Sequence, residues 1–338
     1  QNLYSSMVIF CLIIGPVEQM LTIDNLTTVQ EFILEGFPAV QHLGKPLFMV
    51  HLLLYLVSIT GSIVIVTITW TDHCLQTPMY FFLSNYSFLE SCFITTVIPK
   101  LLAIFLSGRQ TISFAACLTQ TFFFLFLGST CFFLLAVMSL DRYVAICNPL
   151  HYHSIMNIKI CFFLVLSCYV LGFMLIISLV LMVSQLSFCG FNVINHFFCD
   201  LGPLVHLSCS DTSSVESLSF LLSIVIILSS LIVTVISYFN IINTIVNLPL
   251  AKERWRAFST CSSHLIVLFL TYGSVVFIYV KPKQTDRVDV NKEAALVNTV
   301  ITPLLNPFIY TLRNKQVKKA LRDTLYRMRY MKSSWNFR

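Results

Sequence analysis

The chain has 338 residues, of which 57% are hydrophobic and only 11% are Asp, Glu, Lys or Arg. A soluble domain carries about 25% charged residues, so this composition excludes an ordinary soluble protein. Thirty Phe and thirteen Tyr beside ten Gly and eleven Pro argue against a disordered or fibrous chain. The formal net charge of +6 lies mostly in a basic C-terminal tail. We expect membrane lipids as the partner of this tail, and no nucleic acid.

Apolar stretches of about 20 residues, long enough to cross a membrane as helices, recur along the chain. We predict seven such spans: 47–70, 79–99, 117–140, 160–183, 218–246, 258–280 and 294–312. The fold class is therefore an all-α membrane protein with a seven-transmembrane helix bundle. We expect an N-terminal segment over 1–45, the membrane domain over 46–312 and a tail over 313–338. No nucleophile–base spacing, phosphate loop or metal motif stands out, so we expect neither an enzyme nor a cofactor.

The distribution of basic residues predicts how the chain is oriented. If the N-terminus lies outside, the inner segments hold fourteen Lys and Arg residues and the outer segments seven. This bias favours an extracellular N-terminus and a cytosolic C-terminus. Asn25 opens a glycosylation sequon, Asn-Leu-Thr, which is accessible only in that orientation. A second sequon at Asn85 falls inside the second span and is expected to stay unmodified.

Residues 1–19 form an atypical extension without an initiating Met. Their apolar run, Met7–Ile14, is too short to span a membrane and lacks the basic flank of a secretion signal. We expect this stretch to be either upstream sequence or a fragment artefact, and not part of the membrane domain.

Glu90 is the only acidic or basic residue inside the seven spans, apart from Asp141 and Arg142 at the end of the third. Ionisable groups at membrane depth are costly and usually functional. Glu90 is therefore either part of a polar functional site or a protonated carboxyl that is hydrogen-bonded to Ser or Asn neighbours.

Four cysteines lie on the predicted outer side: Cys117 at the start of the third span, and Cys189, Cys199 and Cys209 in the following loop. Cys117 is 25 residues from Arg142, about 38 Å along a helix, so the two lie at opposite membrane faces. Four cysteines on an oxidising face allow three pairings, and spacing leaves the choice open. His196, Cys199 and Asp200 have a metal-like spacing, but a Cys199 held in a disulfide has no thiolate to offer, so no metal site is predicted.

Five motifs carry a family resemblance. They are PMYFFLSNYSFLE over 78–90, MSLDRYVAICNPLHY over 138–152, Ser237-Tyr238, RAFSTCSSHL over 256–265 and PLLNPFIYTLRNKQVKKAL over 303–321. In this order they resemble the olfactory receptors, a branch of the rhodopsin-like G-protein-coupled receptors, from about residue 25 to residue 321. The chain departs from the family pattern at Glu90, Cys131, Leu140 and Thr271.

The resemblance implies roles for the inner ends of the helices. Coupling to a heterotrimeric G protein would fall to Asp141, Arg142, Tyr143, Tyr238, Asn306, Pro307 and Tyr310. His264 either senses pH or, as we favour, is a buried hydrogen-bonded side chain. Val317, Leu321 and Leu325 repeat at i, i+4 and i+8 between basic residues, which predicts a short amphipathic helix after the last span, on the inner leaflet.

The resemblance also implies two disulfides, Cys117–Cys199 and Cys189–Cys209. It suggests that Glu90 helps to hold a sodium ion linked to the inactive state. Cys131 stands where the family often has a Glu, so one expected ligand for that ion is missing.

The ligand pocket implied by the resemblance lies in the outer half of the bundle. Phe124 stands 18 residues before Arg142, where amine receptors have an Asp, and no basic residue lies in the spans, so we expect an uncharged ligand. The expected lining is Phe124, Leu125, Gly128, Ser129, Leu222, Ser223, Ile226, Tyr272, Val275 and Tyr279.

These features predict an odorant receptor of the plasma membrane. It would bind a small, mostly apolar volatile molecule and activate an olfactory stimulatory G protein that raises cyclic AMP. The rival class is a seven-helix transporter or channel, which would require more intramembrane charges or broken helices in paired halves.

Overall fold

The computed structural model describes residues 29–72, 75–190 and 192–280, with the single positions 292, 296, 299, 306, 309, 317–319 and 322 beyond them. The side chains of residues 39, 40, 256, 260 and 275–280 are not part of this description. Several predicted features therefore lie outside the described residues: the extension 1–19, Asn25, Pro307, Tyr310 and most of the seventh span and tail.

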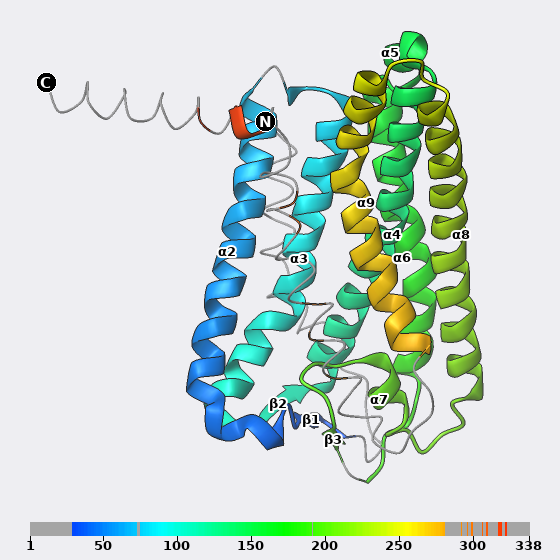
Figure 1. Cartoon of the computed structure of the whole chain (residues 1–338). Coiled ribbons are helices and arrows are strands. Elements are labelled where there is room, and N and C mark those ends of the chain that lie inside the picture. Colours follow the sequence, from blue (N-terminus) through cyan, green and yellow to red (C-terminus); the bar gives the residue numbers. More distant parts are fainter. Residues whose placement is uncertain are drawn as a thin grey trace, which may run out of the picture. The chain divides into compact units, whose positions relative to one another are not determined.

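Six long helices follow one another in the described chain (Figure 1). They are α2 (Gly44–Thr71), α3 (Pro78–Ser107), α4 (Phe114–Cys147), α6 (Ile158–Ser184), α8 (Ser213–Val246) and α9 (Ala251–Val280). Within the described residues, five of them, all except α9, are long and apolar enough to cross a membrane. A helix forms in such stretches because lipid offers the backbone no hydrogen-bond partners, and only a helix satisfies them within one segment.

Each of the first six predicted spans coincides with one of these helices, but the helices extend further. α3 continues to Ser107 and α4 to Cys147, beyond the predicted ends at 99 and 140. Pro99 lies inside α3 without ending it. The hydropathy pattern marks only the part of a helix that is apolar, so a helix with polar end turns is longer than its predicted span.

Short elements connect the long helices. The 3-10 helix η2 (Pro38–Leu43) leads into α2. Between α4 and α6 the chain forms η4 (Pro149–His151) and α5 (Tyr152–Ile155). The five-residue helix α7 (Leu201–Val205) precedes α8.

A three-stranded sheet, which the sequence did not predict, joins three segments that lie far apart in the sequence and outside the long helices. Its strands are β1 (Glu31–Leu34), β2 (Gln110–Ser113) and β3 (Val193–Ile194), in the order β2-β1-β3. β1 pairs antiparallel with β2 and parallel with β3. Phe32 and Leu34 of β1 are fully buried, so β1 contributes both hydrogen bonds and core side chains.

The chain divides into two compact units. The first comprises residues 1–51, 95–126 and 174–222 and contains the sheet. Its core is rich in aromatic rings: Phe32 lies 5.4 Å from Phe188, and Phe37 lies 5.3 Å from Phe197, measured between ring centroids. The second comprises residues 52–94, 127–173 and 223–338, and most of its described residues lie in long helices.

Helices α6 and α8 leave many large apolar side chains exposed, among them Phe163 and Phe239, the latter 72% exposed. Such a surface is normal for a helix in contact with lipid and would be a liability in water. Beyond α9 the described positions 317–319 are helical, with Val317 buried and Lys318 and Lys319 exposed. This alternation fits the short amphipathic helix that was predicted after the last span.

Candidate functional site

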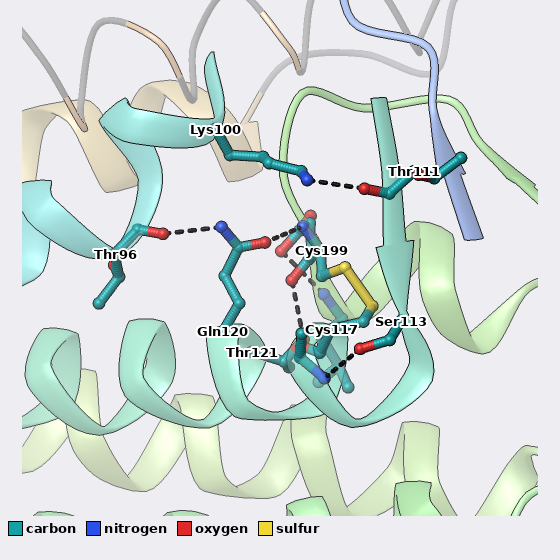
Figure 2. The surroundings of a disulfide bond; sticks show 11 residues. Thr96, Lys100, Thr111, Ser113, Cys117, Gln120, Thr121 and Cys199 are labelled. Atoms are coloured by element: carbon teal, nitrogen blue, oxygen red, sulfur yellow. Dashed lines mark hydrogen bonds between the residues drawn. A yellow bond between two sulfur atoms is a disulfide. The ribbon is translucent and has the colours of Figure 1, made fainter. Parts of the chain in front are cut away.

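In the first unit, the long connection between α6 and α8 is fastened to α4 by a disulfide (Figure 2). Cys117 near the start of α4 is bonded to Cys199, with 5.4 Å between their Cα atoms. A second disulfide joins Cys189 to Cys209 within the connection itself. The structure thus contains both pairings that the family resemblance implied. Because Cys199 is in a disulfide, it has no thiolate to donate to a metal.

Hydrogen bonds reinforce this fastening on two sides. Gln120 on α4 accepts a hydrogen bond from the backbone N–H of Cys199 at 2.9 Å and donates one to the carbonyl of Thr96 on α3 at 2.7 Å. Thr121 donates to the carbonyl of Cys199 at 2.8 Å. Figure 2 shows Gln120 between Thr96 and Cys199. Residue 199 is therefore held by its side chain, its N–H and its carbonyl together.

Asp200 follows directly and caps α7, since its carboxylate accepts a hydrogen bond from the N–H of Leu201 at 3.0 Å. Burial raises the pKa of this carboxyl to about 6, and the bond from Leu201 opposes the shift.

The residues expected to line a ligand pocket are divided between the two units. Phe124, Leu125 and Leu222 belong to the first unit, and the ring of Phe124 lies 4.6 Å from that of Phe198. Gly128, Ser129, Ser223, Ile226 and Tyr272 belong to the second. The side chains of Val275 and Tyr279 lie outside the described residues. Phe198, which comes from the connection after α6, was missed because it lies far from α4 in sequence.

Around Gly128 the structure adds a neighbour that the sequence did not suggest. A Cβ atom at Gly128 would lie 3.6 Å from the ring of Phe93 on α3. On the adjacent turn of α4, Phe132 lies 5.5 Å from the ring of Tyr272 on α9. Both contacts are apolar, as expected for a site that takes an uncharged molecule.

The Asp141–Arg142 pair at the end of α4 is buried in the second unit. Arg142 donates a hydrogen bond to one carboxylate oxygen of Asp141. The other oxygen accepts a hydrogen bond from the hydroxyl of Tyr152 on α5 at 2.8 Å. Burial and the neighbouring carboxylate raise the pKa of the Tyr152 phenol, which keeps it a donor. Tyr152 was part of the recognised motif, but its partner was not predicted.

Tyr238 on α8 and His264 on α9 meet in the same unit. The Tyr238 hydroxyl and Nδ1 of His264 are 2.8 Å apart, and both residues are buried. His264 is thus the buried, hydrogen-bonded side chain that we favoured. Tyr310, which was also expected to take part in coupling, lies outside the described residues.

Glu90 is almost fully buried in α3 and is hydrogen-bonded by two side chains. The amide of Asn306 donates to it, and Tyr86 makes a second side-chain hydrogen bond. These hydrogen bonds agree with the second alternative, with Asn306 coming from a distant part of the chain, and the protonation of Glu90 stays a prediction. A sodium ion at Glu90 stays a prediction.

Comparison with known structures identifies the fold. The chain matches the crystal structure of squid rhodopsin with a TM-score of 0.68 at 16% identity, over 86% of this chain and 82% of rhodopsin. It therefore has the rhodopsin fold, and the prediction of a seven-helix membrane bundle is confirmed.

Sequence comparison then gives the family. The olfactory receptor family model matches residues 51–328. Olfactory receptor 6C2 of Homo sapiens is 48% identical, over 91% of this chain and 98% of that receptor. Olfactory receptor 2AP1 of Homo sapiens is 49% identical, over 90% and 98%. The chain belongs to the olfactory receptor family, G-protein-coupled receptors of the membrane and not enzymes.

Proposed function

We propose that this chain binds a small, uncharged, mostly apolar volatile molecule and, when bound, activates an olfactory stimulatory G protein that raises cyclic AMP. The observation that carries the ligand class is Phe124, whose ring packs against Phe198 where a receptor for amines would need a carboxylate. An apolar ligand with one or two hydroxyl or carbonyl groups suits such surroundings, since a buried ion would lack a partner.

The coupling half of the proposal is supported by the buried polar contacts of the second unit. Arg142 is bound to Asp141, and Tyr238 to His264, so three side chains expected to take part in coupling are already engaged with partners. A ligand that favours a state in which these partners separate would shift the receptor toward the form that admits a G protein.

A panel of uncharged odorants with a cyclic AMP readout tests the proposal in cells that express the full chain. We expect responses to a subset of uncharged compounds and none to charged amines. Arg142→Ala should abolish the response while the receptor still reaches the surface. Responses confined to charged amines, or full signalling from Arg142→Ala, would contradict the proposal.

We further propose that residues 1–45 are extracellular and residues 313–338 cytosolic. The charge bias supports this orientation, as does the sequon at Asn25. Asn85, the competing sequon, is buried in α3 and donates a hydrogen bond to the carbonyl of Phe81 at 2.8 Å. Asn25→Gln should remove a glycosidase-sensitive band shift, whereas a shift that persists until Asn85 is replaced would reverse the assignment.

A further inference from the structure

A row of four aromatic rings leads from the proposed ligand site to the segment that precedes α2, and all four lie in the first unit. Phe124 on α4 packs against Phe198, with 4.6 Å between their ring centroids. Phe198 lies 5.1 Å from Phe197, and Phe197 lies 5.3 Å from Phe37. Phe197 and Phe198 are almost completely buried. Because closely packed rings leave little room between them, a displacement of one ring is passed to the next.

The row ends beside a small cavity of the first unit. Phe37 and Phe105 both line this cavity, and its volume is about 70 Å³. That volume is enough for several water molecules, but it is well below the size of about 300 Å³ at which sites for small ligands begin. The cavity is therefore too small to be an odorant site, but large enough to receive part of a side chain that moves.

The backbone that precedes Phe37 is fastened in place. The N–H of Glu35 donates a hydrogen bond to the carbonyl of Ile194 at 3.1 Å, and the N–H of Gly36 donates one to the carbonyl of His196 at 3.2 Å. Gly36 has a φ of 66°, a left-handed conformation that glycine adopts without strain. Since the chain is fixed to the connection between α6 and α8, a push on Phe37 should turn its ring and leave its backbone where it is.

These contacts define how one wall of the ligand site adapts to the size of a ligand. A large molecule pushes on Phe124, and a row of rings that ended against other packed side chains would resist. Because this row ends at a cavity, Phe37 can turn into it and let the other three rings retreat.

We propose that Phe37 is a positioning residue for the ligand. Through Phe197 and Phe198 it sets how far Phe124 retreats, and so the largest odorant that the receptor accepts. This inference rests on the proposed function, in which Phe124 contacts an odorant.

Dose–response curves for straight-chain primary alcohols, from butanol to decanol, test the proposal in cells that express the full chain. Phe37→Leu removes part of the last ring, so long alcohols should gain over short ones, by about fourfold for each further methylene that finds an apolar place. Phe37→Tyr keeps the ring and should retain the parent's order of potency. Poor folding or surface expression would lower all responses together, whereas the ratio of long to short alcohols moves only if the site changes size. A ratio in Phe37→Leu that equals the parent's would overturn the proposal.

Filling the cavity should have the opposite effect. Gln41 lines the cavity and is exposed, so Gln41→Trp adds bulk there with little disturbance of the core. We expect the longest alcohols to lose about fourfold or more relative to the short ones. Gln185→Trp makes the same change at an exposed position of the first unit outside the cavity and should respond as the parent does. The same length preference in both variants would contradict the role of the cavity.

A fluorine label tests the row of rings without any odorant. We suggest para-fluorophenylalanine in place of Phe198, in the purified full chain in phosphatidylcholine nanodiscs, observed by fluorine NMR. Phe37→Leu should shift the resonance through Phe197, while Phe220→Leu, the same change at an exposed ring of α8, should leave it unchanged. An unchanged resonance in Phe37→Leu would overturn the proposal even in a receptor that responds to odorants. A shifted resonance in a receptor that responds to no uncharged odorant would support the row of rings and contradict the proposed function.

Discussion

The hydroxyl of Tyr152 donates a hydrogen bond to Asp141 at 2.8 Å, on the carboxylate oxygen that Arg142 does not use. Asp141 is 1% exposed, so both oxygens of a buried carboxylate are satisfied by protein groups. The ion pair at the end of α4 is thereby tied to α5, a helix of four residues in the next connection. A motion of this connection and the release of Arg142 are consequently linked.

Removing the Tyr152 hydroxyl should loosen that link. We expect Tyr152→Phe to leave one oxygen of buried Asp141 without its partner, at a cost of about 1–3 kcal/mol in the resting state. Basal cyclic AMP should rise because Arg142 is held less firmly. Ser154→Ala removes an exposed hydroxyl from the same short helix and serves as the control. Basal signalling that stays at the parent level in Tyr152→Phe would show that α5 does not restrain the pair.

The two disulfides should differ in what they contribute to stability. Cys117 and Cys199 are 82 residues apart, and Cys189 and Cys209 are 20 apart. The chain-entropy relation gives about 4.5 kcal/mol for the longer loop and about 3.3 kcal/mol for the shorter one. Replacing the first pair by Ala should lower the free energy of unfolding by about 1 kcal/mol more than replacing the second. Thermal unfolding of both double variants, purified side by side, measures the difference, and an equal or reversed order would contradict it.

Asp200 should make stability fall as pH rises. Its pKa is raised from 3.8 to about 6 in the folded protein, so between about pH 4 and pH 6 the folded state binds more protons than the unfolded one. The stabilisation is complete below this window and is lost as pH rises through it.

The midpoint temperature of unfolding, measured from pH 4 to pH 7, should therefore depend less on pH in Asp200→Asn than in the parent. Asp211→Asn is the matched control: its carboxyl is exposed, and hydrogen bonds from Ser213 lower its pKa, so the slope due to Asp200 should persist there. The same slope in parent and Asp200→Asn would mean that another group titrates.

Gly128 should control the space available to a ligand. A Cβ at this position already comes within van der Waals distance of Phe93, so a larger side chain must displace that ring or fill any adjoining space. Added bulk in a packed site typically costs about 1–3 kcal/mol, so Gly128→Leu should weaken odorant binding about ten- to hundredfold. Gly273→Leu, on α9, is the control, because an added Cβ there would meet no atom of the described residues within 4 Å. Unchanged odorant dose–response curves for Gly128→Leu would place the ligand elsewhere.

The sequence predicted the helices well because lipid imposes one simple requirement, a long apolar stretch. The sequence also located Asp141 and Arg142, because charged residues are rare next to long apolar stretches. It did not reveal that Tyr152 bonds to Asp141, because the chain must first reverse through η4 and α5. Gln120 was missed as well: its two partners, Thr96 and Cys199, lie 24 and 79 residues away.

The sheet was beyond prediction for a related reason. β1 has only four residues, and its partner strands begin at Gln110 and Val193, inside connections between helices. No local alternation marks such short strands, and their pairing exists only once the helices have brought the connections together.

Among the described residues, β1 is the central strand of this sheet, so the connections that carry β2 and β3 are joined there through a segment that precedes the six long helices. Its position matters to anyone who engineers the receptor. A tag or a fusion partner inserted between residues 31 and 36 would separate β2 from β3, which no other described strand joins, while the same insertion before residue 29 would leave the three strands whole. A protease that trims the N-terminus would leave the three strands intact if it stopped before residue 29, and would remove β1 if it continued past Leu34.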